Sequence, residues 1–497
     1  MNSKDKDEII RSVPQTGFFG HPRGLFTLFF TEFWERFSYY GMRAILIFYM
    51  YYEVTQGGLG LDRTTANSIM AIYGSLVYMS GIIGGWIADR LLGTARTVFY
   101  GGILIMIGHI ILSFPGSATA LFVSMAFIII GTGLLKPNVS SVVGDLYSDN
   151  DIRRDSGFSI YYMGINLGGF LAPLIVGTIG QTYNFHLGFA IAAVGMFIGL
   201  IVYLLTRKKN LGLAGQHVPN PLAKEDRFKV FGSIGLGVVI IVILGAIGIN
   251  TGYLTIERFI FIVSILGILI PAAFFIFMYR SPKTNSDERS RLLAYIPLFI
   301  AAMMFWAIQE QGSNILATYA NDRTQLEFAG IKLQSSWFQS LNPLFIVFLA
   351  PVFAWFWIRL GDRQPSTPKK FSLGLFFSGL SFIVMIFPAY LNGTESLANP
   401  LWLVLSFFLV VLGELCLSPV GMSATTKLAP QAFSAQTMSL WFLTNASAQA
   451  INAQVVKLYT EKTEILYFGV IGGIAIVLGI ILFLISPVIQ RQMKGVR

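Results

Sequence analysis

The first apolar run of the chain carries charged and phenolic side chains at helical spacing. They are Glu32, Glu35, Arg36, Tyr39, Tyr40 and Arg43. At about 100° per residue, all six fall on one helix face, within roughly 140°. Burial disfavours a charged carboxylate and a nearby guanidinium favours it, so such a group can exchange a proton as its surroundings change. The pattern indicates proton coupling by the Glu32–Glu35–Arg36 cluster; the alternative is a static buried ion-pair network.

Ionisable side chains recur inside several apolar runs. The full set is Glu32, Glu35, Arg36, Arg43, Lys136, Glu310 and Glu414. A charge at the centre of a membrane helix costs about 2.5–3.5 kcal/mol on insertion scales, which disfavours contact with lipid. Three cations nearly balance four carboxylates, so we expect these groups to face one another or a water-filled cavity. The alternative for Lys136 is that its side chain extends to the membrane surface, beside a helix kink caused by Pro137.

Polar and aromatic side chains also share helix faces in the later runs. These residues are Tyr161, Tyr162, Asn166, Trp306, Gln309, Glu310, Asn342, Glu414, Ser418, Trp441, Asn445 and Gln449. One such stripe alone is more often interhelical packing than a binding site. Stripes in both halves of the chain favour a site between them. Cations in the first half, with Glu310 and Glu414 in the second, predict a zwitterionic substrate that bridges the halves.

The composition of the whole chain is that of a membrane protein. Of 497 residues, 54% are hydrophobic and 12% are charged, whereas soluble domains are about 25% charged. The net charge of +10 comes mostly from Lys and Arg between apolar runs, so we expect no nucleic-acid partner. The single cysteine, Cys416, excludes an intrachain disulfide. The first apolar run contains charged residues, so we expect no cleaved signal peptide.

Apolar runs of membrane-spanning length recur from end to end. We place them at 24–52, 65–90, 97–115, 119–146, 156–180, 186–206, 230–250, 258–280, 291–320, 334–358, 371–391, 400–427, 432–458 and 465–489. Lys and Arg concentrate in the loops on the side of the N-terminus, for example in 207–209 and 280–291. The positive-inside rule therefore predicts a multi-pass inner-membrane protein with both termini in the cytoplasm.

The runs divide as six, two and six. We expect a cytoplasmic N-terminal tail (1–23), a six-helix bundle (24–207), a linker with two additional helices (208–289), a second six-helix bundle (290–490) and a cytoplasmic tail (491–497). Two such halves around a midplane site are a common transporter design. The segment Gly85-Trp-Ile-Ala-Asp-Arg90, followed by Gly93 and Arg96, resembles the loop between helices 2 and 3 of the major facilitator superfamily. We therefore predict an all-α membrane protein with the major facilitator superfamily fold and fourteen transmembrane helices.

Three longer motifs resemble one family. Glu32-Phe-Trp-Glu35-Arg36-Phe37-Ser-Tyr39-Tyr40-Gly41 resembles the E-x-x-E-R-F-x-Y-Y-G motif of the proton-dependent oligopeptide transporter (POT) family. Phe158-Ser-Ile-Tyr161-Tyr162-Met-Gly-Ile165-Asn166-Leu-Gly168 resembles its helix 5 signature, and Gly413-Glu414-Leu-Cys-Leu-Ser418-Pro419 its helix 10 segment. The resemblance spans about residues 23–490, and the pair at 230–280 resembles the two extra helices of bacterial members.

This resemblance implies import of di- and tripeptides, driven by an inward proton gradient, with protons as the coupling ion and no other cofactor. The implied proton-coupling residues are Glu32, Glu35, Arg36 and Glu310. The implied substrate-binding residues are Arg36, Tyr40, Tyr78, Lys136, Tyr162, Asn166, Trp306, Glu310, Asn342, Glu414, Trp441 and Asn445. Arg36 and Lys136 would meet the peptide carboxylate, whereas Glu414 and Asn342 would meet its amino terminus. Arg43–Glu310 and Lys136–Glu414 are the expected gating salt bridges between the halves.

The sequence departs from animal members of the family, which carry a functional histidine in helix 2. The histidines here are His21, His109, His186 and His217, none of them in the second run. We therefore expect carboxylates to carry the proton, and His109 to be a packed interior residue.

Other functions fit less well. A channel is usually built by oligomeric symmetry, which two unlike six-helix halves disfavour. The chain has no HExxH pair, nucleophile elbow or strand-linked phosphate loop, so we predict neither catalytic residues nor a metal site. The alternative is a carrier of the same fold for another small solute, such as nitrate or an amino-acid-like compound. Glu310 and Glu414 favour a substrate with an ammonium group. We expect a monomer in the lipid bilayer.

Overall fold

The computed structural model describes residues 3–148, 151–218 and 220–495, so the ends of the two predicted tails (1–2 and 496–497) and residue 219 of the linker lie outside the described residues. A short helix, α1 (Ser3–Ser12), precedes the first group of long helices. This group consists of α2 (Gly24–Tyr51), α3 (Arg63–Ile87), α4 (Thr94–Leu112), α5 (Ala118–Asp145), α6 (Arg154–Ala172), α7 (Thr178–Thr182) and α8 (Phe185–Asn210). Short helical turns join some of these helices, namely η1 (Val54–Gln56), η2 (Ala88–Leu92) and η3 (Pro173–Gly177).

A helix pair separates this group from a second one. The pair is α9 (Lys224–Asn250) and α10 (Ile256–Arg280). The second group consists of α11 (Ser286–Gln309), η4 (Glu310–Ser313), α12 (Ile315–Asp322), η5 (Ser335–Ser340), α13 (Leu341–Leu360), η6 (Gly361–Arg363), α14 (Thr367–Ile383), α15 (Ile386–Asn392), α16 (Leu401–Leu428), η7 (Gln431–Phe433), α17 (Ser434–Val455), η8 (Val456–Leu458) and α18 (Glu464–Gln492). A small antiparallel hairpin, β1 (Glu327–Phe328) and β2 (Ile331–Lys332), follows α12 and turns at Gly330, where φ is +78°.

The helices are long and apolar enough for an all-α membrane protein, as predicted. Among the described residues, twelve helical stretches meet this condition by length and hydropathy. The remaining long helices, α2 and α17, have 28 and 22 residues but carry more polar side chains. Together they make the fourteen expected helices, since about 17–25 residues cross a membrane. The two polar helices therefore have to be surrounded by protein.

One predicted helix, 291–320, is not continuous. α11 ends at Gln309, a 3₁₀ turn covers Glu310–Ser313, and α12 begins at Ile315. Asn314 leaves helical geometry (φ −126°, ψ −82°), and its side-chain oxygen accepts a hydrogen bond from the N–H of Ile315 over 2.6 Å. Asparagine competes with the helix in this way because its side chain offers the backbone another partner. The break places Glu310 at the end of a helix rather than in its middle.

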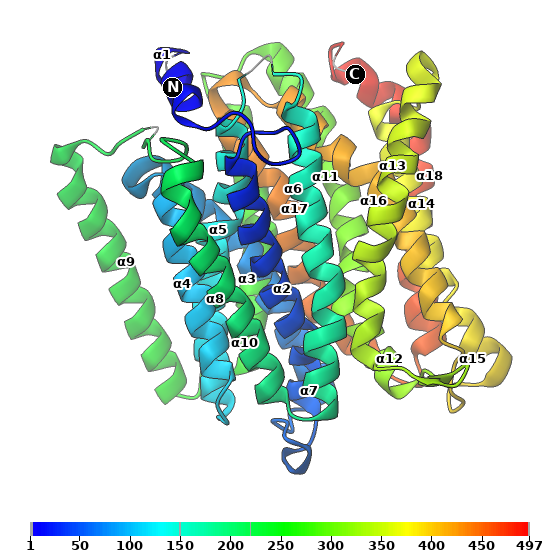
Figure 1. Ribbon diagram of the computed structural model, residues 1–497. Helices are drawn as coiled ribbons and strands as arrows, with labels where there is room; N and C mark the ends of the chain where they lie inside the picture. The colour runs from blue at the N-terminus through cyan, green and yellow to red at the C-terminus, as the bar shows by residue number, and fades with distance from the viewer. Residues whose placement is uncertain (1–2, 149–150, 219, 496–497) are drawn as a thin grey trace.

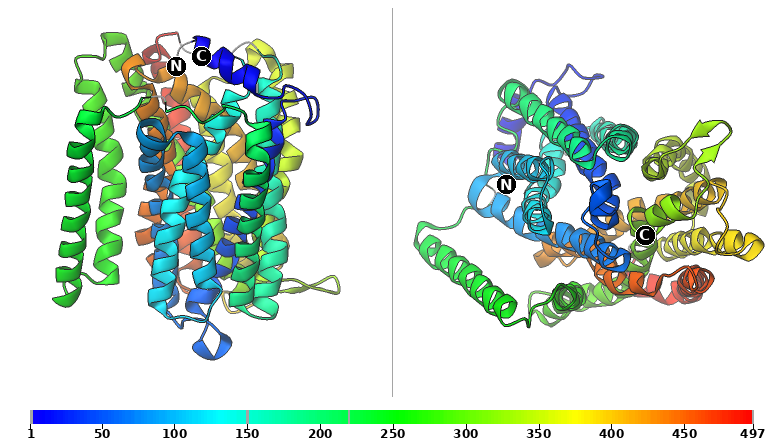
Figure 2. Two further views of the ribbon diagram at one scale, coloured as in Figure 1. Left: turned by 60° about the vertical axis from the view of Figure 1, so that its left-hand side comes forward. Right: turned by 90° about the horizontal axis from the view of Figure 1, so that it is seen from below.

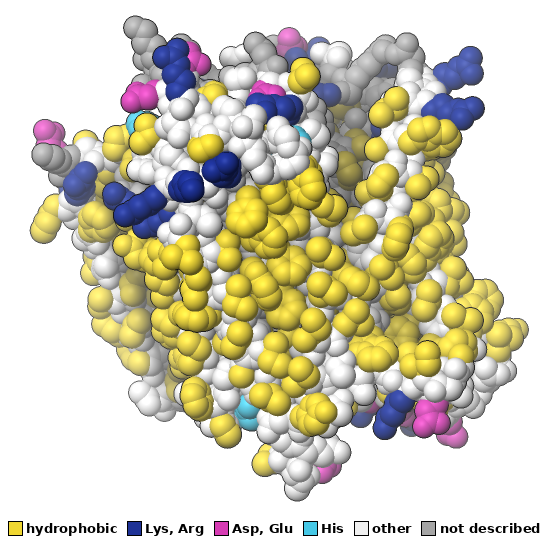
Figure 3. All heavy atoms as spheres, viewed as in Figure 1, with side chains coloured by type: hydrophobic (Ala, Val, Ile, Leu, Met, Phe, Trp, Pro, Cys, Tyr) yellow, Lys and Arg dark blue, Asp and Glu magenta, His cyan; other side chains and the backbone are white. Residues whose placement is uncertain are grey.

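The two helical groups lie side by side, and both termini lie at the same end of the molecule (Figure 1). We call this the terminal end. Hydrophobic side chains form a broad belt on the visible face, and Lys and Arg gather beyond it at the terminal end (Figure 3). α10 packs against α17, where Ser447 Oγ donates to the carbonyl of Gly267 over 2.6 Å. α9 stands apart from the bundle (Figure 2) and its apolar side chains are exposed all round, which suits contact with lipid on every side.

The segment before α2 is held against the loop between α5 and α6. Arg153 donates from Nη1 to the carbonyls of Gln15 and Gly20, over 3.0 and 3.1 Å. The buried His21 ring approaches the hydroxyl of Tyr147, with 3.0 Å between Nδ1 and the phenol oxygen. Burial, and secondarily the Arg153 guanidinium, lowers the pKa of His21. The neutral imidazole is therefore the form that fits this contact.

The contact of the segment before α2 with the loop between α5 and α6 should become less stable in acid. The pKa of His21 is lower in the folded state than its unfolded value of about 6.5. The stabilisation that the neutral His21 gives the folded state is therefore fully present above about pH 6.5 and declines below it. Thermal unfolding of the wild type and of His21→Gln, which does not titrate, measures the effect. The midpoint of the wild type should fall relative to that of the variant between about pH 7.5 and 5.5. Parallel curves for the two proteins would contradict this role of His21.

Candidate functional site

A cavity between the two helical groups collects the predicted site residues. Its lining includes Glu32, Arg36, Tyr40, Arg43, Tyr78, Lys136, Tyr162, Asn166, Trp306, Glu310, Asn342, Glu414, Trp441 and Asn445. Of the predicted site residues only Glu35 does not line the cavity, and it is fully buried. Residues from eight long helices and the 3₁₀ turn thus meet at one site, as the stripes in both halves predicted.

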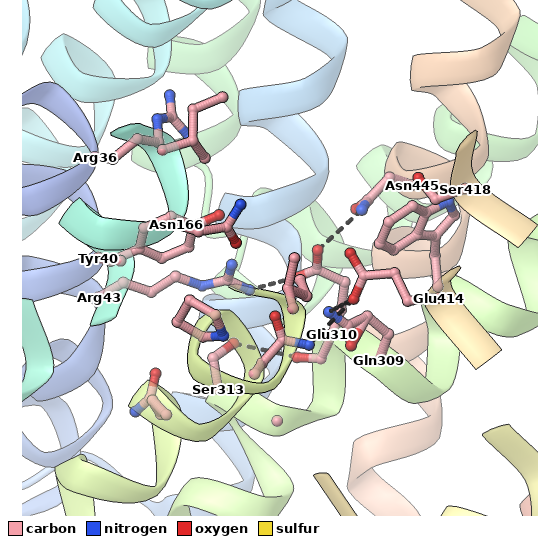
Figure 4. A pocket seen from close by; sticks show the side chains of 18 of the residues that line it. Arg36, Tyr40, Arg43, Asn166, Gln309, Glu310, Ser313, Glu414, Ser418 and Asn445 are labelled. Atoms are coloured by element: carbon pink, nitrogen blue, oxygen red, sulfur yellow. Dashed lines mark hydrogen bonds and ion pairs between the residues drawn. The ribbon is translucent and has the colours of Figure 1, made fainter. Parts of the chain in front are cut away.

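Glu310 is the most heavily contacted carboxylate of this cavity. It forms an ion pair with Arg43 of α2 (Figure 4). Asn445 Nδ2 donates to its Oε1 over 2.9 Å, and the Tyr78 hydroxyl lies 3.5 Å from the same oxygen. Gln449 Nε2 donates to its Oε2 over 2.8 Å. Because these donors come from α2, α3 and α17, the charge on Glu310 joins both helical groups at the helix break.

The Glu32–Glu35–Arg36 cluster forms a compact buried network on α2. Arg36 Nε lies 3.1 Å from Glu32 Oε1 and also contacts Glu35 Oε2. Its guanidinium faces the rings of Tyr39 and Tyr40, at 5.4 and 5.8 Å from the centroids. Among the described residues, one oxygen of each carboxylate has no hydrogen-bond partner. Two carboxylates thus share one guanidinium and are incompletely satisfied, so a change of protonation there changes which contacts hold Arg36.

The second expected salt bridge is not formed in this structure. Lys136 Nζ lies over the ring of Tyr78, 4.2 Å from its centroid, and no ion pair joins it to Glu414 among the described residues. Glu414 Oε2 instead accepts hydrogen bonds from Gln309 and Asn342, over 3.2 and 3.1 Å. Both charges line the cavity, so the helices that carry them, α5 and α16, stand apart here. Lys136 faces the cavity rather than the membrane surface.

Contacts between the two groups close the end of the molecule opposite the termini. Arg63 and Asp322 form an ion pair of 2.6 Å, and the Tyr52 hydroxyl donates to Asn321 over 2.8 Å. Trp337 Nε1 donates to Thr178 over 2.7 Å. At the terminal end a hollow opens between α6 and α13 (Figure 3). The cavity is therefore sealed at one end and open towards the other.

Sequence reasoning left out part of the cavity wall. Gln339 of η5 and Phe407 of α16 line it, but neither stands in a motif or a polar stripe, so no signal in the sequence marks them. Gln309, a residue of the predicted polar stripes, and Ser313 of η4 also line it. His109 is fully buried, and neither ring nitrogen has a hydrogen-bond partner among the described residues. It is a packed interior residue, as expected.

The fold and this site together define a membrane carrier, in which two helical groups enclose a polar cavity that is open at one end. Comparison with known proteins agrees. The POT family model matches residues 95–478, and the chain belongs to this family.

Relatives cover the whole chain. The uncharacterized transporter YclF of Bacillus subtilis is 69% identical over 496 residues, which is 100% of both chains. A di-/tripeptide transporter of Lactococcus lactis subsp. cremoris is 50% identical over 492 residues, covering 97% of this chain and 98% of that protein. The crystal structure of a peptide transporter POT in complex with sulfate matches with a TM-score of 0.97 at 68% identity, covering 99% of this chain and 100% of the other. The family predicted from three sequence motifs is thus confirmed.

Proposed function

We propose that this chain is a proton-coupled symporter that imports di- and tripeptides into a bacterial cell, as a monomer with both termini in the cytoplasm. The observation that carries the proposal is the ion pair of Arg43 and Glu310, which joins the two helical groups inside a polar cavity. The names of relatives support the substrate class, since a protein 50% identical to this chain is a di-/tripeptide transporter. With the termini in the cytoplasm, the structure corresponds to an inward-facing state.

The charges of the cavity suit the two ends of a peptide. Arg36 and Lys136, on one side, can hold the carboxylate by charge-assisted hydrogen bonds. Glu414 and Asn342, on the other, already contact each other and can hold the amino group. Tyr40, Tyr78, Tyr162, Asn166, Trp306, Trp441 and Asn445 complete the proposed binding surface. A nitrate ion fits less well because Glu310 and Glu414 would repel it.

Protonation of Glu310 can be coupled to the salt bridges between the two helical groups. A charged Glu310 holds Arg43, whereas a protonated Glu310 offers it no counter-charge. Protonation of Glu310 from outside would therefore break the ion pair with Arg43, and loss of this proton to the cytoplasm would restore it. Glu32 and Glu35 form a second proton-coupling site, because their protonation would free Arg36 to bind the substrate carboxylate. Substrate and Glu414 would compete for Lys136 in the same way when the cavity closes.

Uptake of dialanine into proteoliposomes tests the function as a whole. Accumulation above the external concentration should occur only with an inward proton gradient, and unlabelled dipeptides should compete with it more strongly than nitrate does. If folded protein takes up no dipeptide with or without the proton gradient, the proposed peptide transport is contradicted and only the carrier fold remains supported.

Weakening the seal opposite the termini should favour the outward-facing state. Asp322→Asn removes the charge that pairs with Arg63, a half-exposed ion pair of the kind worth about 0.2–1 kcal/mol. The native Cys416 is buried, so a Gln339→Cys replacement provides a cavity-facing thiol for labelling. Asp322→Asn should raise the labelling of this thiol by an impermeant reagent from outside by a factor of about 1.4 to 5. Lys332→Ala, on the exposed hairpin, is the control; equal rates in all three proteins would contradict a sealing role.

A further inference from the structure

Gln449 contacts the same carboxylate as Asn445, one helical turn further along α17. Its Nε2 donates to Glu310 Oε2 over 2.8 Å, and its side chain is buried, with 1% exposed. The sequence places Gln449 in a polar stripe, but the family resemblance assigns it no role. Its position beside the ion pair of Glu310 and Arg43 gives it direct access to the proposed proton step.

Gly74 of α3 provides the space that the Gln449 amide occupies. A Cβ atom at position 74 would lie 2.5 Å from Gln449 Nε2 and 3.0 Å from its Cδ. These separations are shorter than van der Waals contact, so a side chain at position 74 would push the amide away. The displaced atoms belong to the end of a flexible side chain, and the helix itself need not move. The amide is thus confined between the backbone of α3 and Glu310.

The amide group can serve Glu310 in both of its protonation states. A charged carboxylate needs donors, which the NH₂ groups of Gln449 and Asn445 supply. A protonated carboxyl group carries an O–H that needs an acceptor. The amide oxygens of Gln449 and Asn445 have no hydrogen-bond partner among the described residues. A primary amide offers donor and acceptor on one group, whereas an apolar side chain would leave the buried acid unsatisfied.

We propose that Gln449 is a positioning residue for the proton step. It donates to the charged Glu310 while Arg43 is bound, and accepts from the protonated Glu310 when that pair opens; at no point does Gln449 itself take up the proton. The inference rests on the proposed function, in which Glu310 exchanges the coupling proton. The other ionisable groups that act on Glu310 are Arg43, Tyr39 and Tyr40 of α2, Tyr78 of α3, Lys136 of α5 and Glu414 of α16.

The pH dependence of dialanine uptake in proteoliposomes tests this role. Gln449→Met keeps the length of the side chain and removes its donor and acceptor. Loss of the donor to the charged Glu310 should outweigh loss of the acceptor for the protonated form, because hydrogen bonds to charged groups are the stronger ones, so the pH midpoint of uptake should rise by about one unit. Gly74→Ala should shift the midpoint in the same direction by displacing the amide. Gln449→Asn, which keeps an amide, should restore part of the wild-type midpoint.

Gln454 is the matched control, because it lies on the same helix and donates to Ser264 over 3.1 Å rather than to the cavity. Gln454→Met should leave the midpoint unchanged. In a Glu310→Gln background, Gln449→Met should no longer alter the pH dependence of counterflow exchange.

Unshifted midpoints in Gln449→Met and Gly74→Ala, both active, would overturn the inference alone. Should Gln449→Met fail to fold, Gly74→Ala decides by itself. If dialanine uptake by the wild type is the same with and without a proton gradient, the proposed function is refuted, and the inference with it.

Discussion

Replacing Glu310 with Gln is expected to abolish gradient-driven accumulation of dialanine while counterflow exchange persists. Glutamine fills the same space but cannot exchange a proton, and it leaves the buried Arg43 without a counter-charge. Breaking a buried ion pair costs about 3–5 kcal/mol, roughly a 10²–10⁴-fold change in the population of the state in which Arg43 and Glu310 are paired. Uptake with an imposed gradient, measured beside exchange at equal pH on both sides, separates coupling from binding.

Glu327→Gln is the control for this replacement, because Glu327 lies on the exposed hairpin away from the cavity. It should accumulate dialanine as the wild type does. Loss of exchange together with accumulation in Glu310→Gln would make Glu310 a binding or structural group. Undiminished accumulation in Glu310→Gln would move the coupling role to Glu32 and Glu35.

Replacing Glu414 with Gln is expected to weaken binding of peptides with a free amino terminus by about 10²-fold. An ammonium group in the cavity would lose a charge-assisted partner, a loss of about 2–3 kcal/mol. The contacts that Gln309 and Asn342 make with Glu414 involve one oxygen only, so the other oxygen is available to a substrate. Competition against labelled dialanine by peptides with and without the amino group measures the difference.

Lys136→Gln is the reciprocal variant. It should weaken peptides with a free carboxylate and hardly affect carboxyl-amidated ones, because Lys136 lies over Tyr78 with its charge facing the cavity. An equal loss for blocked and unblocked peptides in both variants would contradict the proposed orientation of the substrate.

The sequence predicts most of the cavity because charge inside a membrane is costly. Arg43, Lys136, Glu310 and Glu414 had to face protein or water, and all four line the cavity. The pairing of Arg43 with Glu310 was implied by the family resemblance and is present. The pairing of Lys136 with Glu414 depends on how far α5 and α16 are apart, which is a property of the conformational state. A single sequence encodes every state of a carrier, so it cannot specify which pair is closed.

The break between α11 and α12 could not be predicted from hydropathy. Residues 291–320 read as one apolar run, yet Asn314 caps a new helix and Glu310 starts a 3₁₀ turn. The break matters because it gives Glu310 partners from three helices. Gln449 was visible in the sequence only as one member of a polar stripe. Its contact with Glu310 requires the absence of a side chain at Gly74, some 375 residues earlier in the chain.

The contacts that join the two helical groups differ in burial. The end opposite the termini is closed by the pair of Arg63 and Asp322 and by hydrogen bonds of Tyr52 and Trp337. The pair of Arg43 and Glu310 lies deeper, where both side chains are buried. A buried pair responds more strongly to the loss of one charge than an exposed one. Protonation of Glu310 is therefore better suited to trigger opening than any change in the contacts at the end opposite the termini.

The internal pH of proteoliposomes that hold the wild type, with no proton gradient imposed, shows whether peptide and proton move together. Addition of dialanine outside should drive protons inwards with the peptide and acidify the lumen, and Glu310→Gln should abolish this acidification. Entry of dialanine without any change in internal pH would contradict coupling between peptide and proton, and with it the role given to Glu310.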